Sequence, residues 1–293
     1  MLKLRIPAIG AAMAMAVTLP ALAADLYEPP IVEAPPPQIE YRDVSYGGWY
    51  IRGDVGHHWS KMRDDIEYIT YGCGACGAMP GTDGFDFGKL KGSLSAGVGV
   101  GYQISSHLRA DVTGDYWFKS DFRGGTSGTC MGGLPCVSQD TSDFRALLLL
   151  ANAYAELGTY KRITPYIGAG IGGAHVKWSD LRNQIPPHGI DDRHKGAEGW
   201  RFAWALMAGA SYCITSNLHA DVGYRYSQIS GGRMYDYADS SAGGPGSGPG
   251  FHDDIRTHEV RAGLRYQFGA GTPERCGEER IAYQPEPFVP IYK

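Results

Sequence analysis

Charged and apolar residues alternate strictly along several segments of this chain, and the charged ones could pair with one another. In residues 102–116, YQISSHLRADVTGDY, Arg109, Asp111 and Asp115 stand at alternate positions between apolar residues. Side chains of a β-strand point in turn to its two faces, so this segment is predicted to be a strand with one charged and one apolar face. The chemistry that this spacing offers is ion pairing between guanidinium and carboxylate groups that share a face.

The same pattern returns 110 residues further along the chain. Residues 212–226, YCITSNLHADVGYRY, again place Asp221 and Arg225 on one face and apolar side chains on the other. Charges of both signs on one face, with aromatic residues at the ends of the other, are typical of a membrane β-barrel, in which apolar residues face lipid and polar residues face the lumen.

Alternation in all the predicted strands directs a set of charged side chains toward one lumen. The set is Arg52, Asp54, Arg109, Asp111, Asp115, Glu156, Arg201, Asp221, Arg225, Glu259, Arg261 and Arg265. The interior of an eight-stranded barrel is about wide enough for side chains to fill, so opposite charges there are expected to pair. The sequence therefore predicts a salt-bridged plug, and the alternative is a conducting or gated pore.

Six cysteines stand in connections between strands or beyond them. They are Cys73 and Cys76, Cys130 and Cys136, Cys213, and Cys276. An even number of cysteines in an exported chain predicts disulfides, here within the first pair, within the second pair, and between the last two. The alternative for the first four is a four-thiolate zinc site.

Histidines and carboxylates suggest a second alternative, the capture of a metal ion or haem. His57 and His58 are adjacent, and His188, Asp191 and His194 lie close together with Asp192 in a long loop. Imidazole and carboxylate groups are common metal ligands. Polar loop residues of this kind are more often simply solvated, so the sequence predicts no metal site and no cofactor.

An outer-membrane lipid-modifying enzyme is a third alternative. Such an enzyme needs a Ser–His or carboxylate set at the barrel rim. His57, His175 and His258 are predicted to lie outward or at the rim, but no serine accompanies them in a catalytic spacing. We therefore predict that the protein is not an enzyme.

Four segments are expected along the chain: a signal peptide at 1–23, a proline-rich periplasmic arm at 24–46, the barrel at 47–268 and a periplasmic tail at 269–293. Lys3 and Arg5 precede an apolar run that ends in Ala-Leu-Ala, as in a secretory signal. The net charge is −4, and −6 without those two basic residues, which argues against a nucleic-acid partner.

Eight strands are predicted, joined in turn by long loops and short turns. The strands are 48–59, 93–104, 107–118, 145–157, 163–178, 200–212, 217–229 and 255–268, with a bulge near Gly172 and Gly173. The short connections are 105–106, 158–162 and 213–216, and the long ones are 60–87, 119–144, 179–198 and 230–253. Long outer loops and short inner turns predict an all-β, eight-stranded antiparallel up-and-down transmembrane barrel.

Aromatic residues near the ends of the apolar faces are candidates for the two membrane interfaces. They are Trp49, Tyr102, Tyr116, Phe118, Trp200, Tyr212, Tyr224, Tyr266 and Phe268. In the long loops, Tyr68, Tyr71, Tyr235 and Tyr237 could make adaptable contacts with a ligand.

Several motifs in a fixed order resemble a known family. ADLYEPP follows the leader, GGWYIRGDVG opens the first strand, AGVGVGYQI forms the second, and VRAGLRYQF closes the last. Over residues 24–268 the chain resembles the small outer-membrane β-barrel surface antigens of Gram-negative bacteria, the opacity-protein-like and OmpA-like group in the porin family. The tail after Phe268 departs from the family pattern, because its members usually end at that aromatic residue.

The resemblance implies a location in the outer membrane, a role in envelope integrity, and outer loops for adhesion or host contact. The expected partners are outer-membrane lipid and lipopolysaccharide, the barrel-assembly machinery, and a host or matrix ligand at the outer loops. Some relatives in this group bind haem, which keeps the metal or haem alternative open.

Overall fold

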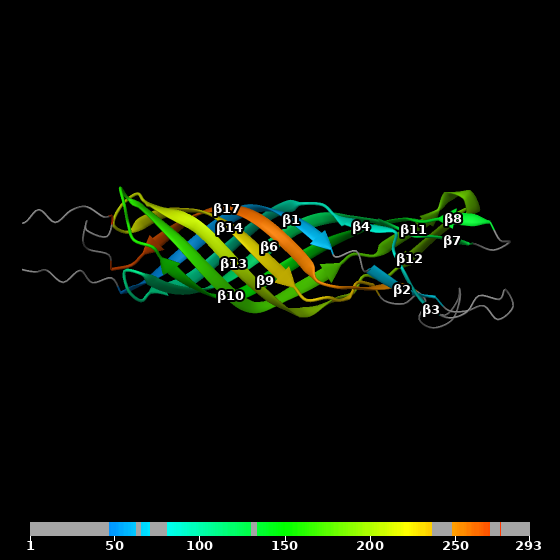
Figure 1. Ribbon diagram of the computed structural model, residues 1–293, viewed down its shortest axis with the longest axis horizontal. Coiled ribbons are helices and arrows are strands. Elements are labelled where there is room, and N and C mark those ends of the chain that lie inside the picture. The colour runs from blue at the N-terminus through cyan, green and yellow to red at the C-terminus, as the bar shows by residue number, and fades with distance from the viewer. Residues whose placement is uncertain are drawn as a thin grey trace, which may run out of the picture. The chain divides into compact units, whose positions relative to one another are not determined.

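The computed structural model describes residues 47–62, 66–70, 81–129, 134–235, 248–269 and 276 (Figure 1). The expected signal peptide and arm lie outside these residues, as does the tail apart from residues 269 and 276. Nearly all described residues are in strands, and one 3-10 turn, η1 (Pro186–His188), interrupts them. Among these residues no helix is long and apolar enough to cross a bilayer.

Eight strands form a closed antiparallel ring (Figure 1). They are β1 (Gly48–Met62), β5 (Ser93–Gln103), β6 (Leu108–Gly125), β9 (Gln139–Glu156), β10 (Ile163–Trp178), β13 (Glu198–Cys213), β14 (Leu218–Ile229) and β17 (Ile255–Gln267). Each strand pairs with its neighbours along the chain, and β17 closes the ring on β1. This confirms the predicted eight-stranded barrel, in which closure leaves no strand edge unpaired in the membrane.

Short turns join the strands at one end of the ring, which we call the inner end; the opposite end is the outer end. The turns join β5 to β6, β9 to β10, and β13 to β14. In the first, Ile104 N–H donates to the Leu108 carbonyl at 2.9 Å, and in the third, Ile214 N–H donates to the Leu218 carbonyl at 2.9 Å. The repeated sequence segment therefore forms two equivalent hairpins, β5–β6 and β13–β14. Two strands separate them on either side of the ring.

The outer end is more ordered than the long loops that the sequence predicted. Nine further strands lie there: β2 (Ile66–Thr70), β3 (Gly81–Gly84), β4 (Phe87–Leu90), β7 (Ser127–Thr129), β8 (Pro135–Val137), β11 (Leu181–Ile185), β12 (Ile190–His194), β15 (Gly232–Arg233) and β16 (Gly248–His252). The expectation of a long loop over 119–144 was wrong, because β6 and β9 stay paired as far as Gly124 and Asp140. Their inward side chains Phe122 and Phe144 are fully buried, which holds this part of the ladder in place.

The predicted bulge near Gly172 and Gly173 was also wrong. Strand β10 pairs with both neighbours without a shift of register. The irregularity lies instead in β6, between Trp117 and Ser120, so that Phe118 and Lys119 both face outward.

Candidate functional site

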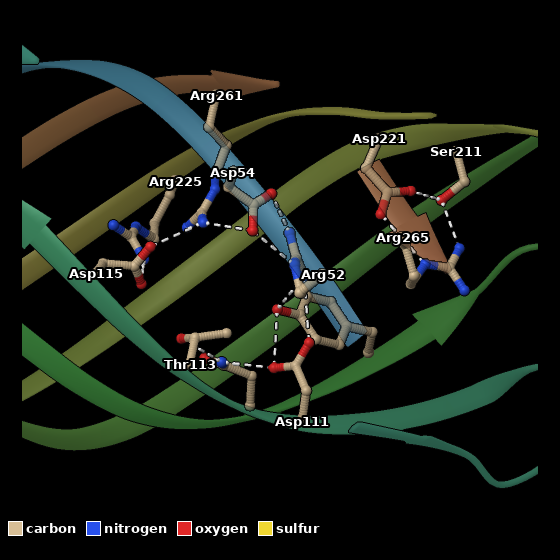
Figure 2. Close-up of polar contacts among 12 residues, drawn as sticks. Arg52, Asp54, Asp111, Thr113, Asp115, Ser211, Asp221, Arg225, Arg261 and Arg265 are labelled. Atoms are coloured by element: carbon tan, nitrogen blue, oxygen red, sulfur yellow. Dashed lines mark hydrogen bonds and ion pairs between the residues drawn. The ribbon is translucent and has the colours of Figure 1, made fainter. Parts of the chain in front are cut away.

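The inner half of the lumen holds a continuous chain of ion pairs between oppositely charged side chains. Eleven of the twelve predicted lumen charges are buried there. In order, the linked residues are Glu156, Arg109, Asp111, Arg52, Asp54, Arg261, Asp115, Arg225 and Glu259. The N–O distances along the chain range from 2.6 Å between Arg225 and Asp115 to 4.0 Å between Arg109 and Asp111. Figure 2 shows most of these contacts, with acids and bases in alternation.

Polar and aromatic neighbours make further contacts with residues of this chain of ion pairs. Tyr50 Oη donates to Asp111 at 3.0 Å, and Asn152 Nδ2 donates to the other oxygen of the same carboxylate at 2.8 Å. The Arg109 guanidinium lies 3.9 Å from the ring centre of Tyr154, within cation–π range. Three of the twelve predicted charges, Asp221, Arg265 and Arg201, lie outside this chain of ion pairs.

Arg265 and Asp221 form a separate pair at 3.2 Å near the inner end (Figure 2). Asp221 also accepts a hydrogen bond from Ser211. Arg201, in contrast, does not belong to the lumen network, and its inclusion there was wrong. It is half-buried near the beginning of β13, at the outer end of the barrel. Its guanidinium donates to His252 Nε2 and to the Arg233 carbonyl.

Glycines on the inward face of β5 make room for the network. An added Cβ at Gly97 would collide with Asp115 Oδ1, and one at Gly101 would collide with the Tyr50 ring. The glycines at alternate, inward positions of SAGVGVG thus leave space for the large polar side chains of the neighbouring strands β1 and β6.

An apolar layer fills the lumen on the outer side of the ion pairs, which the sequence analysis did not foresee. Its largest fully buried members are Trp117, Phe122, Phe144, Leu148, Leu150, Trp178, Leu181, Ile66 and Tyr235. Trp178 lies at its centre, with ring centres 4.7 Å from Phe144 and 5.6 Å from Phe122. His58 stacks on Trp117 at 4.5 Å between the charged and apolar layers. Together the two layers fill the barrel with side chains.

The nine candidate interface aromatics are all exposed on the outside of the barrel. Five of them lie near the inner end (Trp49, Tyr102, Tyr212, Tyr266 and Phe268) and four near the outer end (Tyr116, Phe118, Trp200 and Tyr224). Between them the outward residues are apolar, for example Val98, Ile171 and Val222, which are 70%, 63% and 58% exposed. Trp59 and Phe202 are exposed near the outer end as well and were missed. This arrangement is that of two aromatic girdles around an apolar belt.

Three cysteines lie within the described residues. Cys213 and Cys276 form a disulfide with a Cα–Cα distance of 5.5 Å, which attaches Cys276 to the inner end of the barrel. Cys136 is also disulfide-bonded. Cys73, Cys76 and Cys130 lie outside the described residues, so the two outer pairings stay predictions.

The histidine-containing loop does not assemble the ligands of a metal site within the described residues. Asp191 is occupied by Arg182, whose Nε and Nη2 lie 2.8 Å and 2.5 Å from its two oxygens. These hydrogen bonds lower the pKa of Asp191, and burial lowers the pKa of His194. The side chain of His188 is not among those described. Across the described ranges no three His, Cys, Asp or Glu side chains converge as metal ligands would.

The other candidate residues of the loops and rim whose side chains the structure describes contact neighbouring aromatic side chains. Tyr235, expected to be an adaptable surface contact, is buried in the apolar layer with its ring 5.8 Å from Trp178, and that expectation was wrong. Burial raises its pKa well above the usual range. Tyr71 and Tyr237 lie outside the described residues. The outward histidines contact girdle aromatics: His57 with Trp59, His175 with Trp200, and His258 Nδ1 with Tyr224 Oη at 2.5 Å.

A groove of about 360 Å³ lies on the outward face of the sheet at the outer end. Its lining comes from β6, β9, β11, β12 and the residue before β11: Asp121, Phe122, Arg123, Thr141, Ser142, Asp143, Asp180, Leu181, Arg182 and Arg193. Phe122, Ser142 and Leu181 turn inward and are buried, so the exposed part of the groove is charged and polar. It was not singled out from the sequence, because its residues come from segments that were expected to be loops.

Comparison with known proteins agrees with this architecture. A family model described as outer membrane protein beta-barrel domain matches residues 9–268. A protein of Brucella abortus strain 2308, described as uncharacterised, is 36% identical over 269 residues, which cover 85% of this chain and 93% of that protein. The outer membrane protein PagN of Salmonella typhimurium is 28% identical over 187 residues, covering 61% and 75%, and a putative adhesin of Rickettsia bellii is 23% identical over 235 residues, covering 78% and 91%. The chain belongs to the outer membrane protein beta-barrel domain family and is an outer-membrane protein.

Proposed function

We propose that this protein is a sealed outer-membrane barrel that contributes to envelope integrity and binds a partner outside the cell through the sheet at its outer end. The observation that carries the proposal is the difference between the filled lumen and the extended sheet at the outer end. Ion pairs and an apolar layer fill the lumen, whereas the strands continue beyond the outer girdle and gain new strand partners there.

The length of β6 and β9 supports a role for the outer sheet. A transmembrane strand needs about 9–11 residues to cross a bilayer. Strands β6 and β9 have 18 residues each, and their outer portions pair with β4 and β11. The additional residues are not needed to span the membrane, so they are available for contacts outside it. The similarity to a putative adhesin of Rickettsia bellii is consistent with such a role.

The other candidate functions have less support. A channel would need a continuous path through the buried Trp117, Leu148 and Trp178. In the proposed function the protein acts by binding and not by catalysis, and the outward histidines belong to the aromatic girdle. Lipid and lipopolysaccharide are proposed as the surroundings of the belt, with the barrel-assembly machinery as the partner during insertion.

Removal of one outer hairpin tests the proposal. Leu181 and His194 lie directly opposite each other at the base of β11 and β12, so residues 182–193 can be replaced by a two-residue Asn-Gly turn. Bacteria that export this variant should adhere to matrix-coated surfaces less than bacteria that export the wild type in equal surface amount. A matched control replaces Ser105 and Ser106, in an inner turn, by Asn-Gly. Equal adhesion by the hairpin variant and the wild type would contradict the proposal.

A further inference from the structure

Strand register at the outer end places four basic side chains in one row across five strands. Lys89 of β4 lies opposite Arg123 of β6, Arg123 lies opposite Thr141 of β9, Thr141 lies opposite Arg182 of β11, and Arg182 lies opposite Arg193 of β12. All five side chains are exposed on the outward face of the sheet. With neighbouring strands about 4.8 Å apart, the row is about 19 Å long.

Such a row is unfavourable for the sheet itself. Like charges directly opposite each other on neighbouring strands destabilise the pair. Within the described part of the chain, no carboxylate lies within ion-pair distance of Lys89, Arg123 or Arg193. The row therefore carries positive charge that the described residues do not neutralise, and an external anion would remove the repulsion.

The carboxylates beside the row are already occupied. Asp121 pairs with Lys91 at 3.4 Å, and Asp143 pairs with Lys119 at 3.0 Å. Asp191 takes both hydrogen bonds of the Arg182 fork, and Asp180 accepts from the Gly196 N–H at 3.1 Å. Asp121, Asp143 and Asp180 thus interact with groups outside the row, and Asp191 compensates Arg182 within it. The excess of positive charge on the row is therefore that of Lys89, Arg123 and Arg193.

The row also runs along a hollow. Arg123, Thr141, Arg182 and Arg193 all line the groove of about 360 Å³ on this face. Asp121, Asp143 and Asp180 line the groove too, but Asp121 and Asp143 pair with Lys91 and Lys119. The uncompensated charge along the hollow is therefore the positive charge of the row, which attracts anions. Row and groove are independent observations, one from strand register and one from the shape of the surface, and they coincide.

The chemistry of the groove selects among polyanions. Guanidinium groups bind carboxylate, sulfate or phosphate in a bidentate way. The uncompensated cations Lys89, Arg123 and Arg193, spread over the row, suit a linear ligand with repeated anionic groups. Proteins that bind single-stranded nucleic acid usually offer exposed aromatic side chains on which bases stack. The aromatic residue of this groove, Phe122, is fully buried. Thr141 and the flanking aspartates offer hydrogen-bond acceptors that suit the hydroxyl groups of a sugar.

We propose that the row of Lys89, Arg123, Arg182 and Arg193 binds a linear acidic polysaccharide that carries sulfate or carboxylate groups. The ligand lies outside the cell and the row lies in the sheet assigned above to external contacts, so this inference rests on the proposed function and names a ligand class for it.

The test uses the full-length protein refolded in detergent and a size-defined heparin oligosaccharide as the probe. The wild type should bind the probe, and binding should weaken as salt is raised because the charges are exposed. The double variant Arg123→Gln/Arg193→Gln should bind at least ten-fold more weakly. A matched control, Lys61→Gln, removes an exposed charge at the outer end of β1 outside the row and should bind like the wild type. Retention of the heat-dependent gel mobility shift would show that each variant is folded.

Three results would overturn the inference. The inference fails if the double variant binds like the wild type, or if the control loses as much affinity as the double variant. It also fails if an uncharged dextran oligosaccharide binds as well as the sulfated one. Micelles of rough lipopolysaccharide form a further arm. Row-dependent binding of the micelles without binding of the free oligosaccharide would assign the row to the membrane's own glycolipid and contradict the proposal.

The adhesion test separates this inference from the proposed function. If the hairpin variant loses adhesion while Arg123→Gln/Arg193→Gln still binds the oligosaccharide normally, the outer sheet binds a partner and the row is not its site. If the row binds the oligosaccharide and adhesion does not depend on the hairpin, the ligand class stands and the adhesive role fails.

Discussion

At the scale of single residues, Arg201 and His252 show how a buried imidazole is held in one protonation state. His252 Nδ1–H donates to the Asp253 carbonyl, and Nε2 accepts from the Arg201 guanidinium. A proton on Nε2 would point at the positively charged Arg201 guanidinium, and Nε2 could no longer accept its hydrogen bond. Burial, together with the charge of Arg201, lowers the pKa of His252 to about 3. The arrangement therefore requires a neutral histidine.

This depressed pKa predicts a loss of stability in acid. An unfolded chain takes up the proton near the ordinary histidine pKa of about 6.5, whereas the folded protein resists it down to about 3. The unfolded state thus binds more protons between these values, and stability falls as the pH falls through this window. By linkage the loss at pH 4.5 relative to pH 7.5 is about 2–3 kcal/mol.

Urea unfolding of the refolded protein at pH 7.5 and pH 4.5, followed by tryptophan fluorescence, measures this contribution. His252→Gln should lose less stability on acidification than the wild type. His107→Gln, at an exposed inner turn, serves as the control and should behave like the wild type. The same acid-induced loss in wild type and His252→Gln would contradict the assignment.

At the scale of strands, period-two alternation explains both what the sequence could predict and what it could not. Arg109, Asp111 and Asp115 alternate with apolar residues, so the charged face of β6 was evident. In β9 the run ALLLLA is apolar on both faces, so the buried Leu148 and Leu150 carry no polar signal that marks them as lumen residues. The apolar layer was missed for that reason.

Alternation assigns a face but not a depth or a distant partner. It placed Arg201 correctly on the inward side, yet its contact His252 lies on β16, which was expected to be a loop. The basic row could not be predicted from the sequence either, since it depends on the register of β4, β11 and β12 against β6 and β9. Strand register between segments distant in sequence is set by packing and not by local pattern.

The lipid-facing register of β14 makes a prediction at this scale. Val222 is exposed in the apolar belt, and its neighbour Asp221 points into the lumen. Val222→Arg should lower the free energy of unfolding in lipid by about 2–4 kcal/mol, the cost of an arginine near the bilayer midplane. Val222→Leu, which keeps the apolar surface, should be close to neutral. Wild-type stability of Val222→Arg in a urea titration with lipid vesicles would contradict this register.

At the scale of the whole barrel, two physically different layers close one lumen. Five arginines and six carboxylates pair in the inner half, where a lone buried charge would be costly. Tryptophan, phenylalanine and leucine side chains fill the outer half. The sequence predicted the charged layer and hence a plug, while the structure adds the apolar layer and the ordered sheet beyond it. Both findings direct the search for activity to the outer end.

Conductance of the refolded protein in a planar lipid bilayer tests the central claim, that the barrel is sealed. The account predicts silence, or rare small flickers, at every salt concentration, because both layers would have to open for ions to pass. Steady, large steps whose size rises in proportion to salt would contradict it and would identify the protein as a channel.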